Sequence, residues 1–378
     1  MPLVIFSVLL HAYVGWRIVP ALALPWPAAF AALLLASALL MPLGLWARRI
    51  RAQPLSDRLA WAGLLLMGLF SSLFVLTLLR DLLLLAAAVV VWLRPTFFSL
   101  DGFAAVSAAV VPVLGLALTA LGFVNARRTA AVLTVDVPIA GLPVALHGFT
   151  IAQISDLHIG PTIKDGYLER VVGAVNRIGA DMVAVTGDLV DGSVLQLGAH
   201  VAPLARLESR HGTFFVTGNH EYYSGAPAWI VELRRLGLVV LLNEHVVLRH
   251  DEASLVVAGV TDYGAHHYGA DQRSDPAAAL AGAPGAAAVR LLLAHQPRSA
   301  PAAADAGFDL QLSGHTHGGQ FVPWNFLVRL QQPFTAGLHR WRALWVYTSR
   351  GTGYWGPPLR LGAPSEITRL RLVPVTAR

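Results

Sequence analysis

The stretch that decides the fold is Leu312-Ser313-Gly314-His315-Thr316-His317-Gly318-Gly319-Gln320. It begins inside a predicted strand, Leu310–Ser313, and its two histidines stand at positions i and i+2. Side chains two residues apart point the same way on an extended chain, so both imidazoles can reach one ion. The flanking glycines allow the backbone to turn tightly. The stretch therefore indicates a metal-binding loop at the end of a strand.

Four further segments of this kind occur earlier in the chain, and each follows a predicted strand. They are Ser155-Asp156-Leu157-His158, Gly187-Asp188-Leu189-Val190-Asp191, Gly218-Asn219-His220-Glu221 and Ala294-His295-Gln296. Taken singly, each has an ordinary explanation as a chance pair, a turn or a helix cap. Their joint occurrence, in order and always after a strand, favours one composite site. The expected metal ligands are Asp156, His158, Asp188, Asn219, His295, His315 and His317.

The surrounding pattern is that of an α/β domain, because short β-rich runs alternate with helical ones. Strands are expected near 149–154, 182–186, 212–217, 255–260, 289–294, 310–313 and 343–348. Helices are expected near 165–178, 194–207 and 226–236, with surface helix or loop at 276–288. In open α/β sheets, sites form at the carboxyl ends of strands. Loops from distant parts of the chain are therefore expected to converge on one edge.

The N-terminal third predicts a membrane region. The chain is 55% hydrophobic and 13% charged, with a mean hydropathy of +0.58, which is far from the composition of soluble proteins. Four apolar stretches, about 3–19, 28–46, 59–93 and 104–124, have the length of transmembrane helices. We expect residues 1–128 to form an anchor of about four such helices and residues 129–378 to form the catalytic domain.

The third stretch is interrupted by Arg80-Asp81. We expect one long helix there, because the residues Leu82–Leu93 are too few to return across a bilayer. Arg80 and Asp81 are expected to pair near an interface, and the alternative is a functional intramembrane charge. The first stretch is expected to be a span, since no basic residue precedes Arg17; a signal peptide is the alternative, because Ala21-Leu22-Ala23 resembles a cleavage site.

The positive charge of the chain is concentrated beside these stretches. Before residue 129 there are nine arginines and three aspartates, whereas the remainder has 19 basic and 19 acidic residues. Basic residues follow the second and fourth stretches, namely Arg48, Arg49, Arg51, Arg58, Arg127 and Arg128. By the positive-inside rule these flanks are cytoplasmic, and with four spans the C-terminal domain is too. A hairpin within the third stretch would place that domain outside.

The ligand types indicate which ions the site would take. Imidazole nitrogens mixed with carboxylate and amide oxygens suit manganese, iron or zinc, and the chain has no cysteine to add a thiolate. Two carboxylates do not neutralise two divalent ions, so the site favours an anionic substrate. Asp188, flanked by Gly187, is placed to bridge the two ions. Two ions about 3.5–4 Å apart lower the pKa of a shared water and clamp both oxygens of an in-line displacement.

From about residue 132 onward the chain resembles the calcineurin-like metallophosphoesterase superfamily, most closely its bacterial branch with an N-terminal multi-span anchor. The stretches that carry this resemblance are 153–160, 186–192, 216–223, 312–320 and 349–356. The resemblance implies a two-sheet α/β sandwich flanked by helices, preceded here by an α-helical transmembrane region.

The resemblance also implies individual roles. One metal would be held by Asp156, His158, Asp188 and His317. The other would be held by Asp188, Asn219, His295 and His315, with Asp188 bridging. His220 would stabilise charge on the scissile phosphate and protonate the leaving oxygen, and Asp191 would orient His220. Glu221 has no such role and is treated as structural.

The expected function is that of a membrane-anchored phosphoesterase with two divalent metal ions. It would hydrolyse a phosphoester or pyrophosphate bond by attack of a metal-bridging hydroxide. By analogy with members that hydrolyse UDP-diacylglucosamine, a lipid-linked or envelope substrate is the sharpest expectation. The expected partners are the lipid bilayer and a phosphorylated small molecule or lipid, and the expected location is the bacterial inner membrane with the catalytic domain in the cytoplasm.

Two alternatives remain open at this point. The first is a non-catalytic membrane sensor or transporter that carries a phosphoesterase-like ligand-binding domain; the intact His220 and Asp191 argue against it. The second is a nuclease, but the neutral catalytic half predicts no nucleic-acid partner. Outside the ligand set, His266-His267 is a candidate for a substrate loop, and Tyr354-Trp355 is a candidate for contact with substrate or bilayer.

Overall fold

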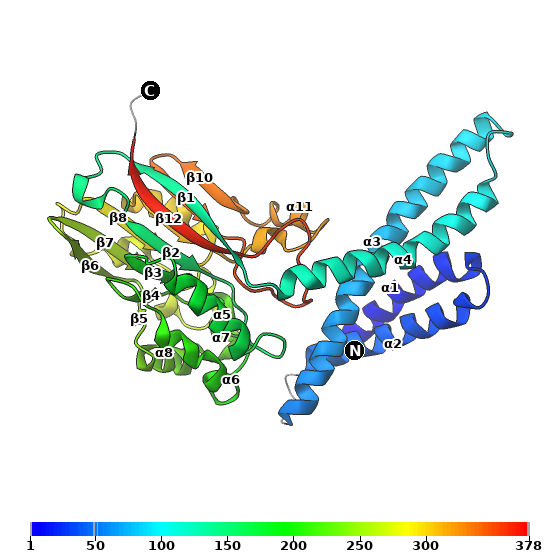
Figure 1. Ribbon diagram of the computed structural model, residues 1–378, viewed down its shortest axis with the longest axis horizontal. Helices are drawn as coiled ribbons and strands as arrows, with labels where there is room; N and C mark the ends of the chain where they lie inside the picture. Colours follow the sequence, from blue (N-terminus) through cyan, green and yellow to red (C-terminus); the bar gives the residue numbers. More distant parts are fainter. Residues whose placement is uncertain (1, 48–49, 51, 376–378) are drawn as a thin grey trace. The chain divides into compact units, whose positions relative to one another are not determined.

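The computed structural model describes residues 2–47, 50 and 52–375, with helices in the N-terminal part and two β-sheets after them (Figure 1). Arg48, Arg49 and Arg51, three of the basic residues after the second apolar stretch, lie outside the described residues. The chain divides into two compact units. Unit 1 is Met1–Arg127 with Gly356–Leu361, and unit 2 is Arg128–Trp355 with Gly362–Arg378. Unit 1 thus includes a short segment from the C-terminal part of the chain, outside the predicted anchor of residues 1–128.

Four long helices make up most of unit 1. They are α1 (Pro2–Ile18), α2 (Trp26–Trp46), α3 (Gln53–Leu93) and α4 (Leu100–Arg127). Leucine and alanine, which have high helix propensity, dominate these segments. All four helices are long and apolar enough to cross a membrane. Because α3 is a single helix of 41 residues, the hairpin alternative for this stretch is wrong.

Asp81 forms the expected ion pair with its neighbour Arg80, but its closer partner is Arg17. The Arg17 Nε donates to both carboxylate oxygens of Asp81, at 3.0 and 2.9 Å, and the Tyr13 hydroxyl donates to it at 2.7 Å. Arg80 lies 3.7 Å from Asp81 and donates instead to the Ser107 hydroxyl and two backbone carbonyls. These bonds join α1, α3 and α4, which favours a structural role for the charges.

Unit 2 is a sandwich of two six-stranded sheets. In spatial order, the first sheet consists of β1 (Ala131–Ile139), β12 (Glu366–Pro374), β2 (Thr150–Ile154), β3 (Met182–Val185), β4 (Thr213–Phe215) and β5 (Val239–Val240). The second consists of β10 (Gly337–Trp341), β11 (Leu344–Thr348), β9 (Leu310–Ser313), β8 (Val289–Leu293), β7 (Ala253–Gly259) and β6 (Glu244–His250). The expected two-sheet α/β sandwich is confirmed.

The core of unit 2 lies between the sheets. Alternate residues of each strand point inward, as Leu291 and Leu293 of β8 do opposite Met182 and Ala184 of β3. A second apolar cluster covers the outer face of the second sheet, where Ala300 and Ala303 pack against it. The site described below is therefore supported by rigid, buried strands.

Helices connect the parallel strands and cover the first sheet (green in Figure 1). They are α5 (Asp165–Asn176), α6 (Val194–Val201), α7 (Asn219–Ser224) and α8 (Ala226–Arg235). The remaining short helices are α9 (Pro276–Leu280), α10 (Ala300–Ala306) and α11 (Asn325–Val328). The helix expected over 194–207 ends earlier, because Pro203 follows α6 and the chain continues as a 3₁₀ helix, Ala202–Arg206.

Candidate metal centre

The segments that follow five strands carry the seven expected ligands. The strands are β2, β3, β4, β8 and β9, and the ligands that follow them, in that order, are Asp156 and His158, Asp188, Asn219, His295, and His315 with His317. Within each sheet these strands are parallel neighbours, so their carboxyl ends meet at one edge. Short distances between ligand side chains from the two sheets show that the two edges lie side by side.

Asp156, His158 and His317 form the first cluster, in which one ligand atom from each lies within 4.8 Å of the others. The Nε2 atoms of His158 and His317 are 3.0 Å apart, and the His317 Nε2 is 3.6 Å from the Asp156 Oδ1. The Asp188 Oδ2 is 3.9 Å from the His158 Nε2. Three lone-pair donors thus converge, with Asp188 at their edge.

Asp188, His295 and His315 form the second cluster. The His295 Nε2 lies 3.1 Å from the Asp188 Oδ2, and the His315 Nδ1 lies 3.2 Å from the His295 Nε2. The Nδ1 of His295 is 2.7 Å from the Thr186 carbonyl, to which it donates, and this bond directs Nε2 into the cluster. The Asp188 Oδ2 therefore faces both clusters, which is the position of a bridging ligand.

Asn219 supplies an independent test of the fit to a metal. Its buried Oδ1 has no hydrogen-bond partner among the described residues, and an unsatisfied buried polar atom costs roughly 1–3 kcal/mol. The next residue, His220, donates its backbone N–H to the Asp188 Oδ1 at 2.9 Å, so Asn219 stands beside the same carboxylate. A cation there would satisfy the amide oxygen. The mixed oxygen and nitrogen set fits divalent transition-metal ions.

Five of the seven expected ligands have a left-handed backbone. Their φ angles are 53° at Asp156, 50° at His158, 51° at Asp188, 71° at His315 and 52° at His317. This conformation costs a residue with a side chain about 1–2 kcal/mol. Such strain gathers at sites where geometry matters more than stability. Its concentration on the ligand positions supports a functional site over an ordinary polar cluster.

Glu221 holds two of the loops together. Its buried carboxylate accepts backbone N–H groups from Gly218 at 2.6 Å, Asp188 at 3.0 Å and Leu189 at 2.7 Å. Burial and the nearby Asp188 charge raise the pKa of Glu221 to about 7. The i,i+3 spacing from Gly218 was the available sequence signal, since a glutamate there can accept the N-cap backbone N–H, as in one half of a capping box. No comparable sequence pattern predicted the bonds that Glu221 accepts from Asp188 and Leu189.

His220 and Asp191 face each other beside the clusters. The Nδ1–H of His220 donates to Asp191 in a short hydrogen bond, and its Nε2 lies 4.0 Å from the Asp188 Oδ2. Burial alone would lower the pKa of His220, but the Asp188 and Asp191 carboxylates outweigh it and raise the pKa to about 9. The pair therefore suits a proton donor near the bridging ligand.

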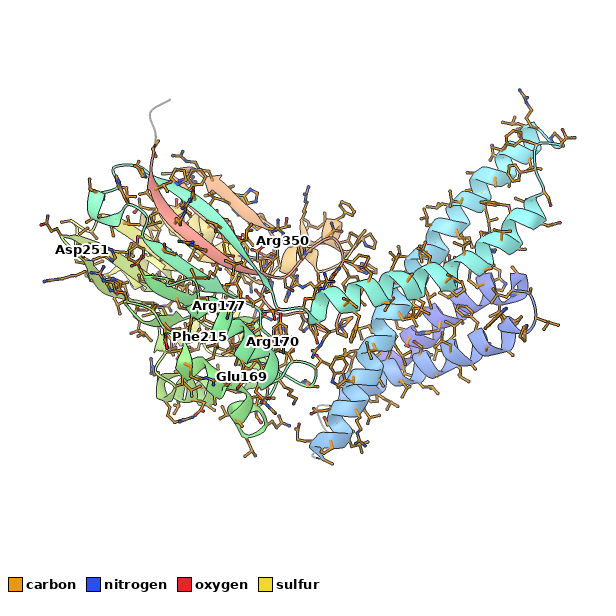
Figure 2. All side chains as sticks on the ribbon, viewed as in Figure 1. Glu169, Arg170, Arg177, Phe215, Asp251 and Arg350 are labelled. Carbon is orange, nitrogen blue, oxygen red and sulfur yellow. The ribbon has the colours of Figure 1, made fainter. Side chains whose placement is uncertain are left out.

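Glycines make room where the His315–His317 loop passes other elements. Gly318 and Gly319 have φ angles of 60° and 79°. A Cβ on Gly319 would overlap Asn325, and one on Gly318 would lie 3.1 Å from the Cγ of Arg350. Arg350, labelled in Figure 2, donates to the Glu366 carboxylate at 2.7 Å. The loop is thus fixed by packing on both sides.

Exposed aromatic rings border His220. The ring centroid of Tyr223 is 5.1 Å and that of Trp355 is 6.0 Å from the His220 centroid. Tyr354 is buried, and its hydroxyl donates to the Thr162 carbonyl at 3.2 Å. Of the pair Tyr354-Trp355, the geometry thus favours only Trp355 for contact with a ligand.

His266 and His267 lie on the surface in a 3₁₀ helix, Ala265–His267, with their ring centroids 4.0 Å apart. The His266 Nδ1 is 3.1 Å from the Tyr263 carbonyl. Their assignment to a substrate loop stays a prediction.

Comparison with known proteins gives consistent matches. A model of the calcineurin-like phosphoesterase family matches residues 149–319, which include all seven expected ligands. A "Transmembrane protein with metallophosphoesterase domain" from Bos taurus is 41% identical over 267 residues, or 68% of this chain and 60% of that protein. An "Uncharacterized metallophosphoesterase" from Aquifex aeolicus (strain VF5) is 36% identical over 220 residues, or 57% of this chain and 82% of that protein.

A third relative, an "Uncharacterized metallophosphoesterase" from Helicobacter pylori (strain J99 / ATCC 700824), is 38% identical over 229 residues. That match covers 59% of this chain and 60% of the relative. The chain therefore spans about three fifths of the bovine and Helicobacter relatives.

Proposed function

Because the chain belongs to the calcineurin-like metallophosphoesterase family, and so is a metal-dependent phosphoric ester hydrolase, we propose that it uses two divalent ions bridged by Asp188. The observation that carries this proposal is the position of the Asp188 Oδ2, which is 3.1 Å from the His295 Nε2 and 3.9 Å from the His158 Nε2. A single carboxylate oxygen thus serves both clusters. Manganese, iron and zinc all fit the mixed ligand set.

The residues divide into holders of the ions and residues that act on the substrate. The first ion would be held by Asp156, His158, Asp188 and His317, and the second by Asp188, Asn219, His295 and His315. When bound, the two ions would acidify a shared water and neutralise charge on the phosphate. His220 would donate its Nε2 proton to the leaving oxygen, and Asp191 would hold the ring by accepting from Nδ1.

The membrane helices bear on where this reaction takes place. The apolar helices and the transmembrane relatives support membrane association. We assign residues 1–128 to the anchor and residues 129–378 to catalysis. We further propose the bacterial inner membrane, with the catalytic domain in the cytoplasm, because Arg127 and Arg128 follow the fourth span. A reporter enzyme fused after Arg378, active only on one side of the membrane, tests this orientation.

We propose a lipid-linked or envelope phosphate as the substrate, with UDP-diacylglucosamine as the first compound to assay. A membrane anchor keeps the site near amphiphiles, and a two-metal site favours anions. A panel of lipid phosphates, lipid pyrophosphates and nucleotide sugars, assayed for metal-dependent release, would identify the class. Release only from water-soluble members would contradict the lipid assignment and leave the phosphoesterase assignment intact.

Removal of metal is expected to abolish hydrolysis by the purified full-length chain. Chelated protein is assayed against a chromogenic phosphodiester and a monoester, before and after addition of manganese, iron or zinc. We expect activity to return with at least one ion. The Asp188→Ala protein serves as the inactive reference. If the wild type never exceeds that reference, on chromogenic or lipid substrates, the chain is a binding module and the proposal is wrong.

Asp191→Asn is expected to lower kcat about 10–100-fold and to move the basic limb of the pH–rate profile to lower pH. Loss of the carboxylate lowers the pKa of His220, which stands at about 9 with Asp191 present, so His220 loses its proton at a lower pH. Asp165→Asn is the matched control, since Asp165 forms a similar 2.7 Å pair with His200 on the surface. A reduced rate with an unmoved profile would assign Asp191 to structure alone.

A further inference from the structure

The stretch that follows His317 exposes a row of large apolar side chains. We call them the α11 surface, and its members are Val322, Trp324, Phe326, Leu327 and Leu330. Leu330 is 85% exposed and Phe326 is 64% exposed. The other exposed large apolar residues among the described part of unit 2 occur singly or in pairs along the sequence. Single residues of this kind are ordinary, but five within nine residues of chain point to an interaction surface.

Hydrogen bonds and packing fix the α11 surface beside the metal-binding loop. At its start, the Gln320 side chain donates to the Trp355 carbonyl and accepts its N–H, both at 2.9 Å. At its end, the buried Gln332 donates to Gln296 at 3.3 Å, and Gln296 adjoins the expected ligand His295. The exposed apolar row therefore belongs to a segment that hydrogen bonds hold in place at both ends.

A segment of unit 1 leads directly to the α11 surface. Phe321 forms a β-bridge with Gly362, and the residues just before Gly362, Gly356–Leu361, belong to unit 1. Gly362 follows Leu361 directly, and its bridge partner Phe321 immediately precedes Val322, the first member of the α11 surface. The chain thus continues from the unit 1 segment into unit 2 without a linker.

Within unit 1, the segment Gly356–Leu361 is held by the helices that could cross the membrane. Leu359 is buried where Gly68 of α3 and Gly122 of α4 leave space, and a Cβ on either glycine would overlap its methyl groups. The Arg360 N–H donates to the Gly122 carbonyl at 2.9 Å, and the Asn125 side chain donates to the Arg360 carbonyl at 3.3 Å. These contacts lie in the last turns of α4.

A second connection is equally short. Helix α4 ends at Arg127 and β1 begins at Ala131, and the three residues between them span at most about 11 Å. Both connections leave unit 1 near the same end of α4. The α11 surface is thus tied to the membrane-crossing helices by covalent continuity, which favours the bilayer over a separate protein as its occupant.

The chemistry of the stretch agrees with this occupant. Tryptophan, phenylalanine and leucine enter the boundary between headgroups and acyl chains, and the exposed Arg329 can meet lipid phosphates. We infer that the α11 surface docks into the bilayer that unit 1 spans, holding the metal centre at the level of lipid phosphates. This inference goes beyond the proposed function, because docking requires neither metal nor turnover.

The absence of cysteine makes a direct test possible in the full-length chain. Leu330→Cys and Leu195→Cys are labelled with the same fluorophore and reconstituted into phosphatidylcholine–phosphatidylglycerol vesicles, with or without nitroxide on the acyl chains. Leu195, on α6, is 96% exposed and serves as the matched control. We expect a several-fold loss of fluorescence at Leu330→Cys and none at Leu195→Cys. Phe326→Cys should repeat the Leu330→Cys result.

Two results would overturn the inference. Equal fluorescence at positions 330 and 195 with nitroxide lipid present would place the α11 surface in water. Energy transfer between donor- and acceptor-labelled Leu330→Cys chains, without quenching by lipid, would assign the surface to contact with a second copy. Because neither measurement uses a substrate, loss of docking and loss of catalysis are distinguished.

Discussion

Asp188→Ala is expected to remove nearly all hydrolysis, lowering kcat/KM by at least about 1,000-fold. The Asp188 Oδ2 faces both clusters, so its loss disturbs the binding of both ions at once. Metal ions supply several kcal/mol of charge stabilisation, and each 1.36 kcal/mol corresponds to a tenfold change in rate. The substitution also removes the carboxylate that accepts the His220 backbone N–H at 2.9 Å.

The measurement pairs steady-state kinetics with elemental analysis of bound metal. We expect metal content to fall together with activity. Asp309→Asn is the control, because Asp309 is a partly buried carboxylate that also accepts a backbone N–H, from Arg290 at 2.8 Å, but it precedes β9 at the opposite end from the ligands. A variant at Asp188 that kept both ions and near-normal activity would refute the bridging assignment.

His220→Gln is expected to lower kcat about 10²–10⁴-fold for substrates with a poor leaving group. The loss should be much smaller for a nitrophenyl ester, whose leaving oxygen needs no proton. Because His220 is assigned no metal, its replacement should leave metal content unchanged. This pattern separates proton donation from metal binding.

The control is His200→Gln, which removes the surface partner of Asp165 and should leave both substrates unaffected. Assays compare kcat on an alkyl and a nitrophenyl phosphodiester at saturating metal. An equal loss on the two would mean that His220 binds the substrate and does not protonate the leaving oxygen.

The sequence predicted the strands that carry the ligands because each is a short apolar run followed by a segment with polar, ligand-type residues. It missed β1 and β12, which pair in parallel along their whole length from Ala131↔Glu366 to Ile139↔Pro374. That pairing joins residues more than two hundred positions apart, so no local sequence pattern predicts it. The hydrophobic patterns of β5, β6 and β10 are likewise too short or too polar to stand out.

The candidate site was predictable for a related reason. Each ligand lies within a few residues of a strand end, so the order of strands in the sheets determines which ligands meet. The hydrogen bonds that hold the loops and helices in place could not be predicted from the sequence, because they join groups that are far apart in the chain. The bonds that Glu221 accepts from Asp188 and Leu189 and the pairing of Arg17 with Asp81 both depend on tertiary packing.

The left-handed backbone at Asp156, His158, Asp188, His315 and His317 has an evolutionary consequence. Glycine would adopt each of these conformations with less strain, so each ligand side chain is held at a local backbone cost. Stability and activity therefore oppose each other at these five positions. A lineage that no longer needed the reaction would be free to drift toward glycine there. The five side chains occupy these positions despite the strain, as expected where ligand geometry matters more than local stability.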